Sequence, residues 1–303
     1  MQIIKAHAFG NDFLLMDAAD VPSGADRPAL ARATCDRHRG LGGDGLIIYN
    51  SSGMRNFAET GPGPDLAAPP ARSGPGPLLA TMALLNADGS YSEVSGNGVR
   101  CLAAWIADQA DAQAGASVTI ETDAGPKRLE LLERSAAGFT FRAAMGQPEA
   151  ITPARIDVDG TLVDAVTLRV GNPQCVVLGA VTEERLHSVA ARLSVHAHFP
   201  HGTNVELATV ESPDRVRILI WERGVGPTEA SGTGACAAAV VAMTHGGASR
   251  DVQVLAPGGS QRVEWLYDGL YLTGSAEIIA VCSWRAAVSG TARTPAGPMK
   301  FHA

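Results

Sequence analysis

The sequence is poor in aromatic residues, in cysteine and in positive charge, and each shortage excludes a class of protein. Only 15 of the 303 residues are aromatic, and 24 Lys and Arg stand against 31 Asp and Glu, which gives a net charge of −7. We therefore expect neither a nucleic-acid nor an anionic-membrane partner. The five cysteines are scattered and form no Cys-x-x-Cys, so we expect no disulfide framework, no metal site and a reducing, cytoplasmic location.

Long apolar runs are also missing. Residues 1–7 contain no signal-peptide core, and the apolar run at 78–85 is too short to span a bilayer. Apolar residues make up 46% of the chain and charged residues 18%, which is typical of a globular protein. The length suits one large domain or two domains of about 150 residues each.

The most informative feature is a short phrase that occurs twice. Residues 93–98 are E-V-S-G-N-G and residues 229–234 are E-A-S-G-T-G, and a small, apolar, helix-like segment follows each copy. The first N–H groups of such a helix are free, and together with the helix dipole they can bind a carboxylate or phosphate. The duplication predicts two similar halves, each contributing a helix start and one serine, Ser95 or Ser231, to a shared cleft.

Many short strands and few helices, arranged twice, predict an α+β fold with two pseudo-symmetric halves. We expect residues 50–77 to form a flexible insertion and residues 285–303 a loosely held tail. The expected helices cover residues 28–37, 97–110, 183–193 and 233–243. The expected strands cover residues 3–5, 13–16, 46–49, 84–86, 118–122, 128–132, 139–143, 162–170, 175–178, 205–208, 216–221, 252–255, 262–267 and 278–281.

Three patterns resemble functional motifs but favour ordinary interpretations. Residues 40–45, G-L-G-G-D-G, match the dinucleotide pattern, but a strand is expected directly after them where a helix should begin, so we expect no nucleotide cofactor. A histidine cluster lacks an accompanying carboxylate or cysteine and is interpreted as part of a loop. Two cysteines occupy equivalent places inside the repeat helices and are expected to pack in the core. The histidines of the cluster are His196, His198 and His201, and the two cysteines are Cys101 and Cys236.

A charged pair, Glu222 and Arg223, ends a predicted strand just before the second phrase. The ordinary interpretation is an exposed salt bridge of little consequence. We favour a functional one, in which Arg223 binds a substrate carboxylate and Glu222 tunes a neighbouring acid or base.

Eight short motifs follow one another along most of the chain: G-N-D-F at 10–13, R-H-R-G at 37–40, N-A-D-G-S at 86–90, G-N-G-V-R-C at 96–101, G-N-P at 171–173, T-N at 203–204, E-R-G at 222–224 and G-T-G-A-C at 232–236. In this order they resemble the diaminopimelate epimerase family. The resemblance implies two strand barrels, each around a central helix, with the active site in the cleft between them. The implied domains are residues 1–144 plus 277–303, and residues 145–276.

The resemblance also implies a function, the cofactor-independent inversion of an amino-acid α-carbon that converts LL- to meso-diaminopimelate in lysine biosynthesis, by a possible homodimer. One thiolate removes the α-proton and a thiol on the opposite face returns one; the two cysteine positions are Ser95 and Ser231 here. Gln174 stands where the family has a histidine that tunes the thiols. The α-carboxylate would bind at Gly96, Asn97, Gly232 and Thr233, and the other polar groups of the substrate at Asn11, Asn86, Asn172, Asn204 and Arg223.

The paired serines leave three interpretations open. A serine hydroxyl is far more basic once deprotonated than a thiolate, so it needs an adjacent base before it can accept a proton. The serines could be an artificial Cys-to-Ser pair. The chain could be a natural epimerase, or an isomerase of another small carboxylate, that uses Glu222 or a water as its base. It could also be a catalytically silent amino-acid-binding paralogue.

In the functional interpretation the Ser95 and Ser231 hydroxyls face each other across the substrate. In the alternative, each serine only caps its own helix.

Overall fold

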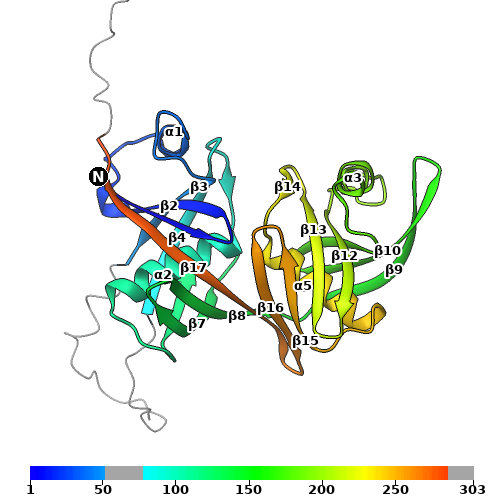
Figure 1. Cartoon of the computed structure of the whole chain (residues 1–303). Helices are drawn as coiled ribbons and strands as arrows, with labels where there is room; N and C mark the ends of the chain where they lie inside the picture. The colour runs from blue at the N-terminus through cyan, green and yellow to red at the C-terminus, as the bar shows by residue number, and fades with distance from the viewer. Residues whose placement is uncertain (52–77, 286–303) are drawn as a thin grey trace, which may run out of the picture.

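The computed structural model describes residues 1–51 and 78–285 (Figure 1). The expected insertion at 50–77 and the expected tail at 285–303 lie, apart from residues 50, 51 and 285, outside the described residues. The strands are β1 (Gln2–Ala8), β2 (Asn11–Asp17), β3 (Gly45–Asn50), β4 (Leu78–Asn86), β5 (Tyr91–Ser92), β6 (Ser117–Glu121), β7 (Lys127–Ser135), β8 (Gly138–Gly146), β9 (Glu149–Val158), β10 (Thr161–Val170), β11 (Asn172–Leu178), β12 (Asn204–Ser212), β13 (Arg215–Glu222), β14 (Gly226–Thr228), β15 (Asp251–Ala256), β16 (Gly259–Leu266) and β17 (Gly269–Ser283).

Two long helices, α2 (Gly96–Gln109) and α5 (Gly232–His245), are the centres of the fold. Every residue from 97 to 107 of α2 is buried, and nearly every residue of α5 up to position 242. A helix that is buried on all sides must be surrounded by other elements. The smaller helical elements lie outside: η1 (Ala18–Asp20), α1 (Arg27–Cys35), and a segment made of α3 (Glu183–Arg185), a π-helical turn η3 (Leu186–Ala190) and α4 (Ala191–Ser194).

The strands around α2 form a closed barrel of eight strands. β1, β2, β3, β4, β6, β7, β8 and β17 pair in this order, and β17 pairs again with β1. One face of β2 and β3 packs against α2, and the other face packs beneath α1. Because both faces are covered, these two strands are apolar without alternation.

The pairing around α5 follows the same plan. β10, β11, β12, β13, β15, β16 and β17 pair in sequence, and β9 lies beside β10. The parallel pair β2–β3 corresponds to the parallel pair β11–β12, and β4–β6 corresponds to β13–β15. The short strands β5 and β14 each add to the strand that ends before the repeated phrase. Helices α3 and α4 then cover the outer face of β11 and β12, as α1 covers β2 and β3.

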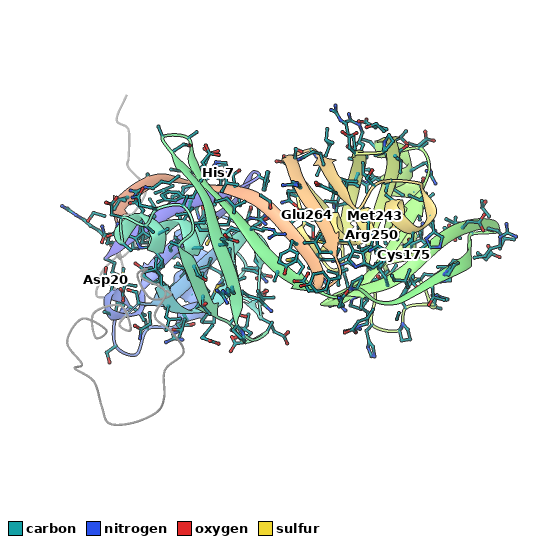
Figure 2. All side chains as sticks on the ribbon, turned by 90° about the horizontal axis from the view of Figure 1, so that it is seen from below. His7, Asp20, Cys175, Met243, Arg250 and Glu264 are labelled. Atoms are coloured by element: carbon teal, nitrogen blue, oxygen red, sulfur yellow. The ribbon has the colours of Figure 1, made fainter. Side chains whose placement is uncertain are left out.

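The long strand β17 belongs to both units. Its first residues pair with β16 and β8, and its last residues pair with β1. Leu270 and Leu272 are accordingly buried in the core around α5, whereas Ala276 is buried in the core around α2. Figures 1 and 2 show this strand, in orange, running from one unit to the other.

The expected mixed α+β fold is confirmed, and so are the four expected helices. Three strands were missed, and β17 is much longer than the expected strand at 278–281. β5 and β14 are too short to show a pattern, and β9 is largely exposed and has Pro153 in its middle, which weakens its strand signal. Among the described residues, no helix is both long and apolar enough to cross a membrane.

Candidate active site

The two repeated phrases form the starts of α2 and α5. Ser95 and Ser231 are the N-cap residues: the Gly98 N–H donates to Ser95 Oγ at 3.1 Å, and the Gly234 N–H donates to Ser231 Oγ at 3.3 Å. The capping contacts take the third N–H of each helix and leave the earlier ones available to a ligand. The capping contacts are therefore confirmed, and the expectation that both hydroxyls also flank a substrate carbon stays a prediction.

The side chain of Asn97 links the two helix starts. Its Nδ2 donates to Asn11 Oδ1 at 3.2 Å and to the carbonyl oxygen of Ala230, the residue before Ser231, at 3.5 Å. Its own Oδ1 accepts from the guanidinium of Arg100, which is 2% exposed. The start of α2, the β1–β2 hairpin and the start of α5 therefore meet at one buried amide.

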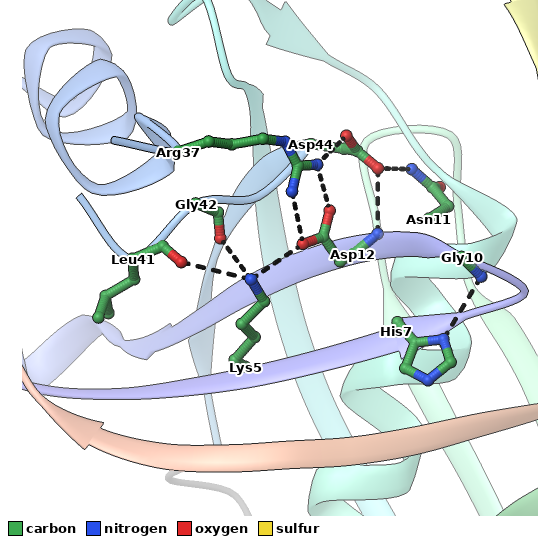
Figure 3. Close-up of polar contacts among 9 residues, drawn as sticks. All are labelled: Lys5, His7, Gly10, Asn11, Asp12, Arg37, Leu41, Gly42 and Asp44. Atoms are coloured by element: carbon green, nitrogen blue, oxygen red, sulfur yellow. Dashed lines mark hydrogen bonds and ion pairs between the residues drawn. The ribbon is translucent and has the colours of Figure 1, made fainter. Parts of the chain in front are cut away.

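Beside Asn11 lies a cluster of paired charges (Figure 3). Asp12, 7% exposed, contacts Lys5 Nζ at 3.1 Å and accepts two hydrogen bonds from Arg37, at 2.7 and 3.2 Å. Arg37 also donates to Asp44 Oδ1 at 2.8 Å. Burial alone would raise the pKa of Asp12, but the hydrogen bonds and charges of Arg37 and Lys5 outweigh it and hold the pKa below its ordinary value.

The start of α5 has acidic residues of a different kind. Glu222, at the end of β13, has a raised pKa because it is buried, and a hydrogen bond with Ser231 partly offsets the rise. Glu206 on β12 is 0% exposed, and neither of its carboxyl oxygens has a hydrogen-bond partner among the described residues. Burial and the charge of Glu222 raise the pKa of Glu206 well above its ordinary value.

Glu206 lies directly beneath the first turn of α5. A Cβ added at Gly234 would be 2.7 Å from Glu206 Oε1 and 3.2 Å from the Cβ of Ser231. The buried carboxyl, the capping serine and Glu222 therefore form one group at this helix start. No ion pair involves either glutamate among the residues with described side chains.

Most of the remaining predicted ligand residues make hydrogen bonds with one another, and Asn86 makes one within a turn. Gln174 Nε2 donates to Asn172 Oδ1 at 2.6 Å. Asn204 Oδ1 accepts from the backbone N–H of Arg223 at 3.0 Å. The guanidinium of Arg223 donates to the carbonyl oxygen of His201 at 2.7 Å, so it lies on the neighbouring turn. Asn86 donates to Ser90 Oγ at 2.9 Å and so belongs to the turn after β4.

The ordinary interpretations of the other motifs hold where the structure tests them. β3 begins at Gly45, inside the apparent dinucleotide motif, so no helix starts there. Cys101 and Cys236 are 0% exposed, and burial raises the pKa of each thiol to about 12, which confirms that they pack in the cores. His196 contacts the carbonyl oxygen of Asp157 at 3.1 Å in a loop.

Six residues of the site were missed from sequence: Lys5, Asp12, Arg37, Asp44, Arg100 and Glu206. Two of them carried a signal, because Glu206 lies within an apolar strand and Arg100 within an apolar helix, and a buried charge is rare without a role. Asp44 carried none, because it is separated from Asn11 by more than thirty residues and only the parallel pairing of β2 with β3 brings the two together.

Solved structures share this fold. A Bacillus anthracis phenazine biosynthesis protein of the PhzF family matches with a TM-score of 0.63 and 14% identity, over 93% of this chain and 98% of that chain. A hydroxyproline epimerase from Agrobacterium vitis matches with a TM-score of 0.57 and 13% identity, over 93% and 90% of the two chains. The fold is therefore of the class to which these two proteins belong.

The sequence comparisons are more specific. The model of the diaminopimelate epimerase family matches residues 3–151 and 166–279. The diaminopimelate epimerase of Desulfitobacterium hafniense is 35% identical over 92% of this chain and 96% of its own length. The enzyme of Desulforudis audaxviator is 36% identical over 94% of this chain and 99% of its own length. The chain belongs to the diaminopimelate epimerase family.

Proposed function

We propose that this protein is a cofactor-independent amino-acid epimerase that acts on diaminopimelate in lysine biosynthesis. The substrate α-carboxylate binds across the starts of α2 and α5, at Gly96 and Asn97 on one side and at Gly232 and Thr233 on the other. The observation that carries this proposal is the pair of capped helix starts, joined by the Asn97 side chain to the carbonyl of Ala230. Both helices direct N–H groups and the positive ends of their dipoles toward a developing carbanion charge.

The polar residues around these starts hold the rest of the substrate. Arg223 is the residue best suited to a second carboxylate, because a guanidinium can bind one with two parallel hydrogen bonds. To do so it must leave the carbonyl of His201. The asparagines at 11, 86, 172 and 204 supply further amide donors and acceptors.

Inversion of a carbon requires a base on one face and an acid on the other. We propose that Ser95 and Ser231 occupy these two faces. The pKa of a hydroxyl is too high for it to act alone, so Glu222 is the base on the Ser231 face; its hydrogen bond to Ser231 and its raised pKa support this role. No charged partner of Ser95 is found among the described residues, so reprotonation there is expected to be slow.

The position of Glu222 beside Ser231, with no charged partner described beside Ser95, also favours a second candidate function. An enzyme with one effective base and a raised-pKa carboxyl suits an isomerisation in which Glu222 removes and returns a proton on a single face of a small carboxylate. A silent amino-acid-binding protein is the third possibility, and it would bind the same ligands without exchanging their protons.

Proton exchange separates these functions. The protein is incubated with LL-diaminopimelate in deuterium oxide, and the α-proton signal is followed by NMR. The epimerase predicts slow wash-in of deuterium with formation of the meso isomer, and a large increase in S95C/S231C, because thiols ionise near neutral pH. Adding Q174H should increase the rate further. No exchange of diaminopimelate in the wild type or in the triple variant would contradict the proposal.

We infer further that the two helix-centred units are pseudo-symmetric halves with the active site between them. The division that fits best is residues 1–144 plus 277–303 for the first half and residues 145–276 for the second. The change of core along β17 between Leu272 and Ala276 supports this division. Separate expression of the two parts would test it.

A further inference from the structure

The side-chain amide of Asn11 is held at both ends. Its Nδ2 donates to Asp44 Oδ2 at 2.7 Å, and its Oδ1 accepts from Asn97 Nδ2 at 3.2 Å (Figure 3 shows the first contact). An ionised carboxylate only accepts hydrogen bonds, so Asp44 requires the nitrogen end of the amide. The carbonyl oxygen of Asn11 must then face the start of α2, and its second lone pair is available to a ligand.

Asp44 is itself fixed by its neighbours. The backbone N–H of Asp12 donates to Asp44 Oδ2 at 3.0 Å, and Arg37 donates to Asp44 Oδ1 at 2.8 Å. Arg37 is in turn held by Asp12, which also contacts Lys5. Charge-assisted hydrogen bonds of this kind are stronger than neutral ones and restrict rotation of the carboxylate.

The equivalent asparagine of the second unit is held with the opposite polarity. Asn11 and Asn172 are the first residues of the corresponding strands β2 and β11, and each follows a glycine with positive φ, Gly10 at 82° and Gly171 at 75°. At Asn172 the oxygen is the engaged end, because it accepts from Gln174 Nε2 at 2.6 Å. The nitrogen of Asn172 is then the end that can serve a ligand.

We propose that Asp44 is a positioning residue that fixes the amide of Asn11 with its oxygen toward the ligand, so that Asn11 accepts a hydrogen bond from an ammonium group while Asn172 donates one to a carboxylate. The inference rests on the proposed function, because it takes both asparagines as ligand residues. It adds to that function the polarity of each contact and the residue that sets it. Asp44 acts only through Asn11 and does not touch the substrate.

The variant Asp44→Ala tests this inference, because it removes the carboxylate oxygen that accepts from Asn11 Nδ2 and so lets the Asn11 amide turn round. Calorimetry on the full chain compares diaminopimelate with pimelate, which has both carboxylates and no ammonium group. We expect Asp44→Ala to weaken the binding of diaminopimelate about tenfold, the loss of one hydrogen bond to a charged group, and to leave the binding of pimelate unchanged. Asp164→Ala is the matched control, because Asp164 also pairs with an arginine, Arg155, on an exposed surface.

The side-chain NH₂ signals of Asn11 give a second measurement on the ligand-free chain. They are assigned by their absence in Asn11→Ala, and we expect Asp44→Ala to shift them while Asp164→Ala does not. Unshifted signals would overturn the inference, and so would an equal loss of affinity for both ligands, which would indicate a general structural role. If the wild type does not bind diaminopimelate at all, the proposed function fails, and the NMR measurement still decides whether Asp44 orients Asn11.

Discussion

The first turns of α2 and α5 rest on different residues at the same place in the two units. A Cβ added at Gly98 would be 3.0 Å from the Cδ1 of Ile47, and one added at Gly234 would be 2.7 Å from the Oε1 of Glu206. Ile47 and Glu206 occupy corresponding strands, β3 and β12, and each faces the third residue of its central helix. The fold can therefore close over an isoleucine at this position, and it does not require a carboxyl group there.

The acidic side chains of the two units also have different surroundings. In the first unit, Asp12 and Asp44 lie beside the cations of Lys5 and Arg37, and the Asn11 side chain links Asp44 to the start of α2. In the second unit, a fully buried acid lies under the helix start without an ion pair. The comparison teaches that the ion-paired carboxylates of the first unit fix the orientation of the Asn11 amide, whereas burial in the second unit raises the pKa values of Glu206 and Glu222 beside Ser231.

The largest effect is expected when a glutamate is placed at the first unit's position. Ile47→Glu would bury a carboxyl among the apolar side chains of Phe13 and Leu84, in the core around α2. We expect a loss of roughly 3–5 kcal/mol in the free energy of unfolding, measured by urea denaturation. Ile47→Val is the control and should cost about 1 kcal/mol. If Ile47→Glu costs no more than the control, the two positions are interchangeable and the comparison fails.

The second-largest effect is expected for Asp12, an ion-paired carboxylate of the first unit. The pKa of Asp12 is lowered in the folded protein, so its stabilisation is complete above the unfolded pKa of about 3.9 and is lost as the pH falls through the lower folded pKa. We expect Asp12→Asn to cost about 2 kcal/mol at pH 7 and progressively less below pH 4. Denaturation curves across this pH range check the sign. A cost that stays constant down to pH 2 would show that charge pairing is not the cause.

The third effect concerns Glu206, which makes the stability of the protein depend on pH in the opposite direction from Asp12. Glu206 has a raised pKa when folded, so the wild type loses stability as the pH rises above the unfolded pKa of about 4.3, until the folded pKa is passed. Glu206→Gln does not titrate and keeps the size of the side chain, so the buried position no longer carries a group that must ionise. We expect the variant to exceed the wild type by about 1 kcal/mol at pH 8 and to match it near pH 4. Thermal melting at both pH values tests this, and a variant less stable than wild type at pH 8 would contradict it.

The smallest expected effect concerns Ser95 and Ser231, the N-cap residues of α2 and α5. Ser95→Ala and Ser231→Ala should each cost about 1 kcal/mol of stability, because each removes one N-cap hydrogen bond. Only Ser231→Ala should also raise the pKa of Glu222 further, since it removes the hydrogen bond that lowers that pKa. Carbon NMR of the glutamate carboxyl groups measures this shift. Equal Glu222 titrations in the two variants would show that Ser231 and Glu222 do not interact.

Parts of the fold that depend on local signals could be predicted from the sequence. α1 begins where Asp26 caps a helix with a proline in its first turn, and α2 and α5 follow a capping serine and glycine. The continuity of β17 could not be predicted, because Gly274 interrupts the strand pattern between residues 270–273 and the expected strand at 278–281. A Cβ added at Gly274 would be 2.8 Å from the Phe9 ring and 3.3 Å from the Arg100 guanidinium.

The candidate site was predictable in the same uneven way. Ser95, Ser231 and Glu222 belong to motifs that stand out in the sequence, and the structure brings Ser231 and Glu222 together. The links from Asp44 to Asn11 and from Asn97 to Ala230 depend on strand register and on the approach of the two helices. Such long-range contacts leave no pattern in the chain.

The shared strand β17 has a consequence for how the chain is made. Gln2 pairs with Ser283, so the first barrel needs a strand that leaves the ribosome only after nearly all other described residues. Until then β1 and β8 are unprotected edges during translation, and the α5 unit also lacks its last strand. Both units are completed at the same late moment, by one segment, which makes folding slow and post-translational in its final step. A nascent chain without this segment would be a target for chaperones.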